Sequence, residues 1–391
     1  MRIGENRDPI MVTMAELQAL LRSRGLPVSG SKTVLLQRLA SAGVPVPENA
    51  RPSAAAPSAP AVAVSSIASI PRDATPRAAP VTTPCVRLAT WNVAGLRALL
   101  RNERGVDSLR RLATDCDVVL LQETKLQEMH VASVEAELLD VLSTGTSMPW
   151  RAAWASSTAR LGYAGVATLW TGGRSLGAAV ADAAICTPLI VDPEHEADRE
   201  GRTLLLQLPL SPSAQLAVVN VYTPNSGAEL QRLKYRTSDD GWDSRFRAAL
   251  LRAQQAPPSA TGSARRAQHV CAGGDFNVAV GEADFFNPDE LRMAKQAGTT
   301  AEERASMRLY AEAPLFMTDA FRSCHPHASG QYTYWSQRAR NRPRNRGLRL
   351  DYFLLSSSVM AVDALRDVQH RHELEGSDHC PVEVELELGR L

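Results

Sequence analysis

The sequence predicts an α/β domain preceded by a small helical hairpin and a flexible linker. Three observations lead to this fold class. From residue 85 to residue 391, short apolar runs typical of strands alternate with helical patterns. Residues 12–43 carry two short helical patterns separated by a turn. Residues 44–84 are mostly Ala, Pro, Ser and Val without aromatic residues, so they offer too little apolar surface to order themselves.

The charge and hydropathy of the chain exclude some functional classes. The formal net charge is +1, so any attraction to nucleic acid must come from a local patch. Only four of the 43 basic residues are lysine, and phosphate contacts would therefore be mostly bidentate arginine contacts. No apolar run reaches about 18 residues, so we expect no membrane span.

Cysteine usage and the N-terminus favour a reducing compartment. The six cysteines lie far apart and show no Cys-x-x-Cys spacing, which argues against a zinc site and a disulfide framework. The first 12 residues lack the apolar stretch of a secretory signal. An organellar transit peptide stays open, although acidic Glu5 and Asp8 argue against a simple one.

The N-terminal hairpin begins with a capping box formed by Thr13 and Glu16. Leu17, Leu20 and Leu21 recur on one helical face. The pattern of leucines, glycines and basic residues over about 30 residues resembles a SAP domain, which implies DNA binding. The alternative is a helical hairpin with solvated basic residues. The candidate phosphate contacts are Lys32, Arg38, and Arg22 or Arg24.

The third segment, residues 85–391, holds nearly all the aromatic residues. We expect a surface loop at Pro257–Arg266. Helical patterns lie near Asp107–Thr114, Val131–Leu142, Ala228–Leu251 and Ala301–Glu312. The predicted strands are Val86–Asn92, Val118–Leu121, Gly165–Trp170, Leu204–Leu208, Leu216–Tyr222, His269–Gly273, Leu350–Leu355 and the alternating Val382–Leu388.

Acidic and amide residues stand at the ends of five predicted strands. Each alone has an ordinary explanation, because Asn and Asp are common turn formers. Five strands with the same kind of ending are harder to dismiss, since strand ends of an α/β sheet converge on a cleft. The residues concerned are Asn92, Gln122 and Glu123, Tyr222 and Asn225, Asp275 and Asn277, and Asp378 and His379.

These residue types suit the hydrolysis of a phosphodiester. The reaction needs charge neutralisation, an activated water and a protonated leaving group. Glu123 and Asp378, with the amide of Asn92, form an oxygen site suited to Mg²⁺ or Mn²⁺. His379 is the best candidate to contact the scissile phosphate.

Further carboxylates could serve the same reaction. Asp351 would orient His379 and raise its pKa. Asp275, with Asn277, would position and deprotonate the water, or protonate the leaving oxygen. The sequence therefore predicts a hydrolytic site built from several strand ends.

Eight segments, in this order and spacing, are similar to exonuclease III-type AP endonucleases of the endonuclease/exonuclease/phosphatase superfamily. The resemblance runs from about Val86 to Leu388 and implies a four-layer α/β sandwich, with two packed mixed sheets flanked by helices. The segments are Thr90–Val93, Leu121–Lys125, Gly162–Ala167, Glu200–Arg202, Val221–Asn225, Gly274–Ala279, Arg349–Phe353 and Gly376–Pro381.

The resemblance implies a reaction and a role for each matching residue. The family incises DNA 5′ to an abasic site, leaving a 3′-hydroxyl and a 5′-deoxyribose phosphate, and commonly clears blocked 3′ ends or acts as a 3′–5′ exonuclease. The implied roles are Glu123 as main metal ligand, Tyr222 and Asn225 on the phosphate or leaving group, Asp275 and Asn277 on the water, and His379, oriented by Asp351, on the phosphate. The residues implied near the metal are Asn92, Glu123, Asp275, Asn277, Asp378 and His379.

Two positions depart from the family pattern. Ala94 stands where the family often has Asp or Asn, so we expect weaker metal binding. Leu348 stands where the animal enzymes place a Trp in the abasic-sugar pocket. Tyr334 and Trp335, with Leu350, could still form an apolar pocket for a flipped sugar, although core packing of the two aromatic residues is an equal alternative. The candidate DNA contacts of this domain are Lys125, Asn225, Tyr334, Trp335, Arg346 and Leu348.

A basic run precedes Asp351 and favours contact with the DNA backbone over a solvated loop. The expected partner is therefore double-stranded DNA with abasic sites or blocked 3′ ends, bound by a monomer in the nucleus or, alternatively, in an organellar nucleoid. The alternatives are another phosphoesterase of the superfamily, or a DNA-tethering scaffold with an inactive domain, which only Ala94 supports. The run comprises Arg338, Arg340, Arg342, Arg344 and Arg346.

Overall fold

The computed structural model describes residues 19–24, 26, 39, 84–144, 148–191, 199–255 and 267–391. The chain divides into two compact units, Met1–Ser65 and Ser66–Leu391. In the first unit, residues 19–22 are helical and the side chains of Leu21 and Leu39 are fully buried; most of the predicted hairpin over residues 12–43 lies outside the described residues. Lys32, Arg38 and nearly all of the predicted linker lie outside the described residues.

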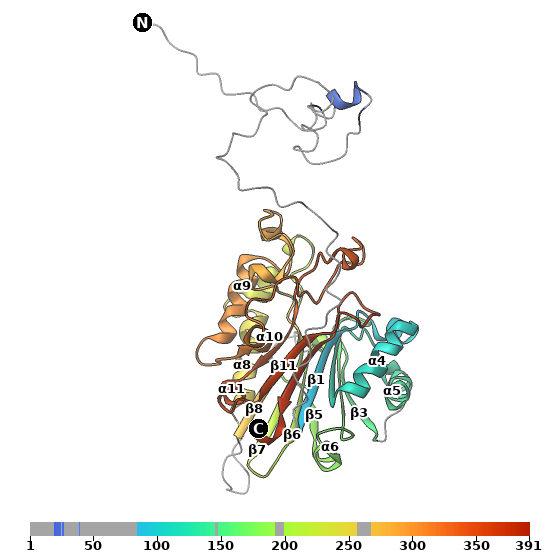
Figure 1. The fold of residues 1–391 in the computed structure, drawn as a ribbon, viewed down its shortest axis with the longest axis vertical. Helices are drawn as coiled ribbons and strands as arrows, with labels where there is room; N and C mark the ends of the chain where they lie inside the picture. Colours follow the sequence, from blue (N-terminus) through green and yellow to red (C-terminus); the bar gives the residue numbers. More distant parts are fainter. Residues whose placement is uncertain are drawn as a thin grey trace. The chain divides into compact units, whose positions relative to one another are not determined.

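The second unit contains two six-stranded sheets (Figure 1). Both sheets are mixed, because β1 runs parallel to β2 and β7 parallel to β8 whereas the remaining pairs are antiparallel. The first sheet has the order β11 (Leu365–His370), β12 (Val382–Glu387), β1 (Cys85–Asn92), β2 (Val118–Gln122), β4 (Val166–Thr171) and β3 (Trp150–Ala155). The second has the order β5 (Ile185–Thr187), β6 (Thr203–Pro209), β7 (Ala214–Tyr222), β8 (Ala267–Asp275), β10 (Asp351–Leu355) and β9 (Thr318–Asp319).

The central strand β2 illustrates why the strands form a layered core. All of its side chains are buried because both faces of the sheet are covered. Val118 and Leu120 lie in the core between the sheets, where they meet Val218 of the second sheet. Val119 and Leu121 point the other way, into the core beneath the helices. This alternation follows from the pleat, in which successive side chains point to opposite faces.

Helices cover the outer faces of the two sheets on opposite sides of the domain (Figure 1). On the first sheet lie α4 (Glu103–Asp115) and α5 (Glu128–Ser143), whose leucines share a core with β1 and β2. On the second lie α8 (Trp242–Gln254) and α9 (Ala301–Arg308). The result is the four-layer α/β sandwich implied by the resemblance, which is thereby confirmed.

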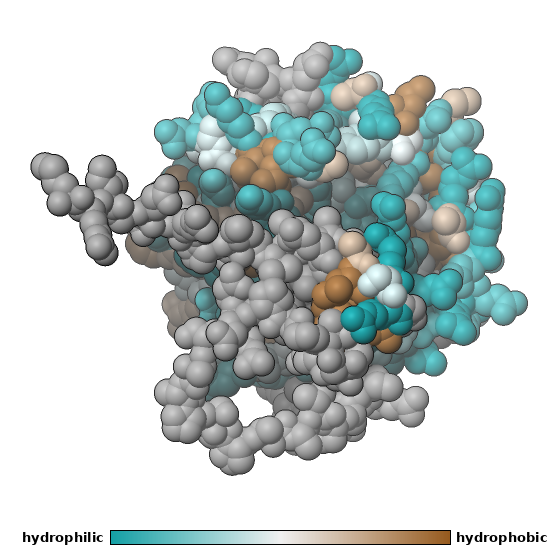
Figure 2. Space-filling view, turned by 90° about the horizontal axis from the view of Figure 1, so that it is seen from above, coloured by the Kyte–Doolittle hydropathy of each residue, from teal (hydrophilic) through white to brown (hydrophobic). Residues whose placement is uncertain are grey.

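The second unit also contains short helices and 3₁₀ turns. No helix among the described residues is long and apolar enough to cross a membrane. Among the coloured residues visible in Figure 2, hydrophilic residues predominate and apolar residues form only small patches. The short helices are α3 (Leu96–Leu100), α6 (Ala178–Ala183), α7 (Leu233–Thr237), α10 (Ala320–Cys324) and α11 (Ser357–Ala361), with 3₁₀ turns at Ala228–Leu230, Glu282–Asp284, Met293–Lys295, Leu309–Ala311, Arg342–Arg344 and Leu388–Arg390.

The helix predicted over Ala228–Leu251 was wrong as one element. The structure divides this segment into a 3₁₀ turn, α7 and α8. Glu229 and Leu230 have positive φ values of 54° and 59°, which a continuous right-handed helix does not allow. At Gly241 a Cβ atom would lie 2.6 Å from the carbonyl oxygen of Arg236, so this tight connection needs glycine. The predicted helix near Ala301–Glu312 likewise ends as α9 at Arg308 and continues as a 3₁₀ turn.

Candidate active site

The polar strand ends meet at one edge of the sandwich, around a cavity of ≈ 820 Å³. β1 and β2 are parallel and therefore end on the same side, while antiparallel pairing sets Asp351 at the start of β10 opposite Asp275 at the end of β8. The predicted convergence is confirmed for most of these residues, whereas Asn92 and Gln122 are fully buried and do not line the cavity. The strand-end residues that line the cavity are Glu123, Tyr222, Asn225, Asp275, Asn277, Asp378 and His379.

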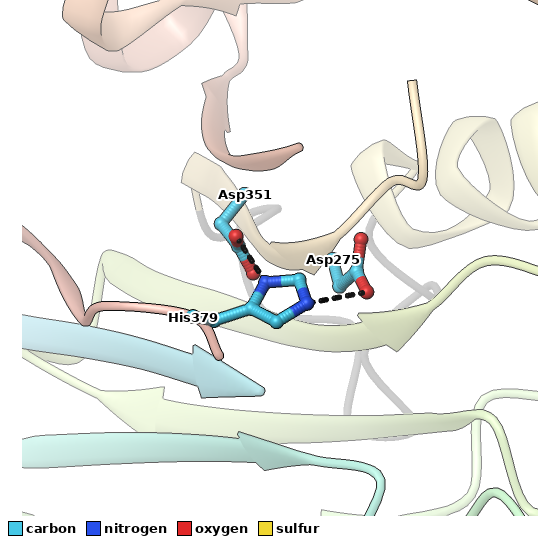
Figure 3. A group of neighbouring side chains, drawn as sticks. All are labelled: Asp275, Asp351 and His379. Atoms are coloured by element: carbon cyan, nitrogen blue, oxygen red, sulfur yellow. Dashed lines mark hydrogen bonds and ion pairs between the residues drawn. The ribbon is translucent and has the colours of Figure 1, made fainter. Parts of the chain in front are cut away.

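His379 lies between two carboxylates (Figure 3). Its Nδ1 is 2.7 Å from Oδ2 of Asp351, and its Nε2 is 4.0 Å from Oδ2 of Asp275. All three side chains are almost completely buried. The backbone carbonyl of His379 accepts a hydrogen bond from Nε1 of Trp91, which fixes the segment that precedes β12. The imidazole is therefore held in one orientation, with Asp351 on one side and the cavity on the other.

Burial and mutual charge set the protonation of this group. Burial and the nearby charge of Asp351 raise the pKa of Asp275 to about 7, although His379 opposes the shift. For His379, burial lowers the pKa, but Asp351 and Asp275 outweigh it and raise the pKa to about 10. The imidazole is consequently a cation at neutral pH. Asp275 lies near the point where it can both accept and release a proton, as an acid/base group requires.

Glu123 is a second acidic group in the same cavity, apart from the group formed by Asp275, Asp351 and His379. Its Oε1 accepts hydrogen bonds from the Tyr222 hydroxyl at 2.8 Å and from Nδ2 of Asn92 at 3.1 Å. Its Oε2 is 2.8 Å from Nζ of Lys125. Burial raises the pKa of Glu123, but the hydrogen bond and charge of Lys125 dominate and lower it overall. Glu123 is therefore a carboxylate whose second oxygen already attracts a cation.

Asn92 does not line the cavity, and its predicted role as a metal ligand stays a prediction. Its Oδ1 accepts a hydrogen bond from the backbone N–H of Ala94 at 3.0 Å. Its Nδ2 donates to Glu123 and, at 2.8 Å, to Oδ2 of Asp275. Asn92 is fully buried and its Nδ2 links Glu123 to Asp275.

The amides of Asn225 and Asn277 form a second polar wall. Nδ2 of Asn225 donates to Oδ1 of Asn277 at 2.9 Å, and Nδ2 of Asn277 donates to the Thr223 carbonyl at 2.9 Å. The backbone N–H of Asn277 donates to Oδ1 of Asp275 at 2.8 Å. These bonds leave Oδ2 of Asp275 to face His379.

Several residues of the cavity wall adopt left-handed backbone conformations. Ala94, Glu123, Lys125 and Asn277 have φ values between 50° and 53°, and all four line the cavity. For a residue other than glycine this conformation costs roughly 1–2 kcal/mol. Such strain gathers at functional sites, where the surrounding structure enforces a required geometry.

The other half of the cavity is partly apolar. Tyr334, Leu348 and Leu350 line it, as predicted, together with Phe286 and Met293, which the sequence analysis did not single out. The Tyr334 ring contacts the His379 ring, with 4.9 Å between centroids. An apolar wall thus adjoins the charged centre directly.

Trp335, in contrast, is part of the core, so its predicted contact with DNA is wrong. Its side chain is buried with Tyr332 and Cys380, and it does not line the cavity. Its Nε1 donates to Oδ1 of Asn345 at 3.1 Å, which supports the loop before β10. The core alternative that the sequence left open therefore holds for Trp335 and not for Tyr334.

The basic run has two structural roles. Arg344 and Arg346 are exposed and line the cavity, as a backbone contact requires. Arg342 donates to the carbonyl oxygens of Ser377, His372 and Leu374, and its guanidinium lies 4.9 Å from the centroid of the Trp335 ring. Arg342 therefore holds the segment leading to His379, and its contact with DNA stays a prediction.

Arg236, which the sequence analysis did not identify, supports the cavity from behind. Its Nη1 donates to the carbonyl of Asn277 at 2.8 Å, and its Nη2 donates to the carbonyl of Phe276 at 2.6 Å. Its charge is balanced by Asp243 and Glu303, and all three side chains are at most 3% exposed. Arg236 therefore fixes the backbone that carries Asn277.

We expect Arg236→Met to destabilise the domain by about 3–5 kcal/mol, because it leaves two buried carboxylates without their cation. Urea unfolding followed by circular dichroism measures this loss. Arg252→Met is the matched control, since Arg252 is exposed on the next helix, α8, and it should stay within about 0.5 kcal/mol of the parent. A loss for Arg236→Met as small as that of the control would contradict the role assigned to this buried ion group.

This architecture and cavity define the class of protein: the chain belongs to the Endonuclease/Exonuclease/phosphatase family, whose model matches residues 89–379. A SAP domain model matches residues 12–42. The family and the SAP domain predicted from the sequence are thereby confirmed.

Individual relatives define the resemblance further. The DNA repair nuclease APEX1 of Danio rerio is 35% identical over 76% of this chain and 81% of its own length. The exodeoxyribonuclease of Bacillus subtilis is 32% identical over 76% of this chain and 98% of its own. The crystal structure of the AP endonuclease LMAP from Leishmania major is 32% identical, with a TM-score of 0.65 over 78% of this chain and 88% of that one.

Proposed function

We propose that this protein is a DNA-repair AP endonuclease that hydrolyses the phosphodiester 5′ to an abasic site, giving a 3′-hydroxyl and a 5′-deoxyribose phosphate. The observation that carries the proposal is the cavity itself. It holds a protonated His379 beside Asp275, a separate carboxylate at Glu123, and an apolar wall. The names of the relatives, which include an AP endonuclease and an exodeoxyribonuclease, favour this substrate, and we propose 3′-phosphodiesterase and 3′–5′ exonuclease as side activities.

In this proposal each group around the phosphate has one task. The His379 cation binds a non-bridging oxygen, with Asp351 holding its ring in place. Asp275 accepts the proton of the attacking water, and Asn277 fixes the orientation of Asp275 through its backbone N–H. Tyr222 and Asn225 bind the phosphate from the opposite wall. Lys125, at the same wall, is a candidate contact for the DNA backbone.

A divalent cation fits beside Glu123, and we propose Mg²⁺, with Mn²⁺ as a substitute. Glu123 and Asp378 both line the cavity, and carboxylate oxygens are the ligands that these hard cations prefer. The Lys125 ammonium at Oε2 of Glu123 marks a position where a positive charge is stabilised. A bound cation would neutralise charge that develops on the phosphate and the leaving oxygen. Ala94 supplies no side-chain oxygen there, which favours weak binding of the cation.

The apolar wall suits a sugar without its base. Tyr334, Leu348 and Leu350 offer surface but few hydrogen-bonding groups, so they would accept an extrahelical deoxyribose more readily than a whole nucleotide. Arg346, exposed at the rim with its guanidinium 5.2 Å from the centroid of the Phe286 ring, would contact the DNA backbone beside the flipped site.

The SAP domain suggests a second site that binds duplex DNA outside the candidate active site. We propose that the chain acts as a monomer on damaged duplex DNA, in the nucleus or alternatively in an organellar nucleoid, with the segment over residues 44–84 as a linker. A tethered second binding site raises the local concentration of DNA at the catalytic domain without fixing its geometry.

The double variant Lys32→Ala/Arg38→Ala tests this tether in the full chain. Loss of two phosphate contacts should make the slope of log K against log salt shallower by about 2, and weaken binding at moderate salt. Fluorescence anisotropy with an undamaged duplex measures both quantities. Arg111→Ala/Arg308→Ala removes two exposed arginines that do not line the cavity, and it should leave the slope unchanged. An unchanged slope in the first variant would exclude Lys32 and Arg38 as phosphate contacts.

The proposed activity is tested on a duplex oligonucleotide that carries one abasic-site analogue. We expect incision at the analogue with Mg²⁺, none with EDTA, and none in the intact duplex. A 3′-recessed duplex and a duplex with a 3′-phosphoglycolate report the side activities. Removal of 3′ blocks without incision would shift the main role to 3′-end processing. No reaction on any of these substrates, with folded protein across metals, would favour a different phosphoesterase or a scaffold.

A further inference from the structure

Arg202, in the Glu200–Arg202 segment, has no role in the reaction described so far. It directly precedes β6 and its side chain is 2% exposed. Each part of its guanidinium has an acceptor. Nε donates to Oε2 of Glu200 at 2.7 Å, Nη1 to the carbonyl of Tyr222 at 3.0 Å, and Nη2 to the hydroxyl of Tyr163 at 2.9 Å.

The same guanidinium lies over the aromatic ring of Tyr222. The distance from its central carbon to the ring centroid is 4.7 Å. The carbonyl of Arg202 also accepts a hydrogen bond from the backbone N–H of Tyr222 at 2.8 Å. Tyr222 is therefore held by both backbone groups and by one face of its ring. Its hydroxyl, at the far end, donates to Glu123.

The partners of Arg202 are themselves fixed. Glu200 also accepts from Nη2 of Arg232 at 3.1 Å, and the Tyr163 hydroxyl accepts from Nη1 of Arg232 at 2.7 Å. Arg202 consequently has little freedom to move away from Tyr222. Its three acceptors lie in different directions, a pattern that the planar fork of arginine satisfies and the single ammonium of lysine does not.

Stability alone explains this arrangement poorly. Burying an arginine and its carboxylate carries a large desolvation cost, and apolar replacements of such groups are often neutral or stabilising. The Arg202 guanidinium instead lies where it restricts the movement of Tyr222, a side chain of the candidate active site. An error of about 1 Å in the position of a reacting group can reduce a rate about 10²-fold, so restriction of Tyr222 has a functional value.

We propose that Arg202 is a positioning residue for Tyr222: it clamps the ring and backbone of Tyr222 so that the hydroxyl stays directed at Glu123 and the phosphate. This inference rests on the proposed function, because Tyr222 is placed in the phosphate wall there. It assigns a task to a segment outside the cavity lining, and it predicts that Arg202 acts only through Tyr222.

A double-mutant cycle tests this dependence. We expect Arg202→Met to lower kcat on the abasic duplex about 10²-fold with little change in KM. In a Tyr222→Phe background the same substitution should have almost no further effect, since the hydroxyl it positions is gone. Arg202→Lys, which keeps the charge but not the planar fork, should resemble Arg202→Met. Arg87→Met, which removes a partly buried ion pair with Glu385 outside the cavity, is the control for general destabilisation.

A measurement without substrate separates failure of this inference from failure of the proposed function. The chain has seven tyrosines, so incorporation of 3-fluorotyrosine gives seven sites for ¹⁹F NMR, and Tyr222→Phe assigns one of them. We expect the Tyr222 resonance to broaden or split in Arg202→Met and to stay sharp in Arg87→Met. A sharp single Tyr222 resonance, additive losses in the cycle, or full activity of Arg202→Lys would each overturn the inference. Inactivity of the parent protein on every DNA substrate would instead overturn the proposed function, and the NMR result would still decide whether Arg202 orders Tyr222.

Discussion

Replacing His379 by asparagine is expected to reduce incision of an abasic duplex by about 10³- to 10⁴-fold. Asparagine keeps a hydrogen bond toward Asp351 but carries no charge. The parent imidazole is a cation at neutral pH, because Asp351 and Asp275 raise its pKa to about 10. The loss therefore removes the buried positive charge that faces the phosphate. The loss of activity should appear as a lower kcat, since the positive charge of His379 stabilises the reaction most when negative charge develops on the phosphate.

Single-turnover incision rates with saturating protein measure this effect apart from DNA binding. His327→Asn changes an exposed histidine that does not line the cavity, and it should leave the rate unchanged. Asp275→Asn should give a loss of similar size, because an amide accepts no proton from water. A rate within threefold of the parent for either active-site variant, with an unchanged circular dichroism spectrum, would remove that residue from the reaction.

The second large effect is expected from Glu123→Gln. This substitution keeps the size of the side chain and a hydrogen-bond acceptor for Tyr222, but removes the negative charge that a cation would neutralise. We expect the Mg²⁺ concentration for half-maximal incision to rise by more than about 100-fold, beyond the 10–100-fold effects typical of residues that only support metal ligands. The maximal rate should also fall.

Calorimetric titration with Mn²⁺ checks this prediction independently of activity. The parent should bind one Mn²⁺ at this site, and Glu123→Gln should lose that binding. Glu312→Gln, which neutralises an exposed acidic residue outside the cavity, is the control and should bind as the parent does. Unchanged Mn²⁺ binding by Glu123→Gln would show that the cation is held elsewhere, for example by Asp275 and His379.

The strands could be predicted from the sequence wherever a run of apolar residues coincides with side chains that are buried in the structure. All eight predicted strands are present, because each carries a continuous or alternating apolar run. The strands that the pattern does not reveal are short or lie outermost in their sheets. β3 is rich in alanine, β11 is mostly polar, and β5 and β9 have three and two residues. Their strand character comes from pairing with a neighbour and not from local preference.

The candidate site was predictable as a set of strand ends, but the direction of individual groups was not. Asn92 stands at the expected place, yet its carboxamide oxygen is used by the backbone of Ala94. Tyr334 and Trp335 are adjacent aromatic residues, and only the pairing of their segment with Leu348 and His379 decides which one faces the cavity. Such choices depend on tertiary contacts that no local pattern encodes.

Buried arginines are the largest omission of the sequence reasoning. Arg202, Arg236 and Arg349 are almost completely buried, each beside one or two carboxylates. Arginine is normally a surface residue, so composition gives no reason to place it inside. One signal was available for Arg202 and Arg349, since each lies in one of the eight segments of the resemblance, but neither residue carried an assigned role.

The central claim is that this cavity breaks the bond on the 5′ side of the abasic sugar by hydrolysis. The measurement that tests it most directly is the chemistry of the new ends on a duplex with a natural abasic site. We predict a 3′-hydroxyl that a DNA polymerase extends without further treatment, formed only with a divalent cation and lost in Glu123→Gln. A 3′ end that cannot be extended, formed equally well in EDTA, would mean cleavage on the other side of the sugar and would contradict the account.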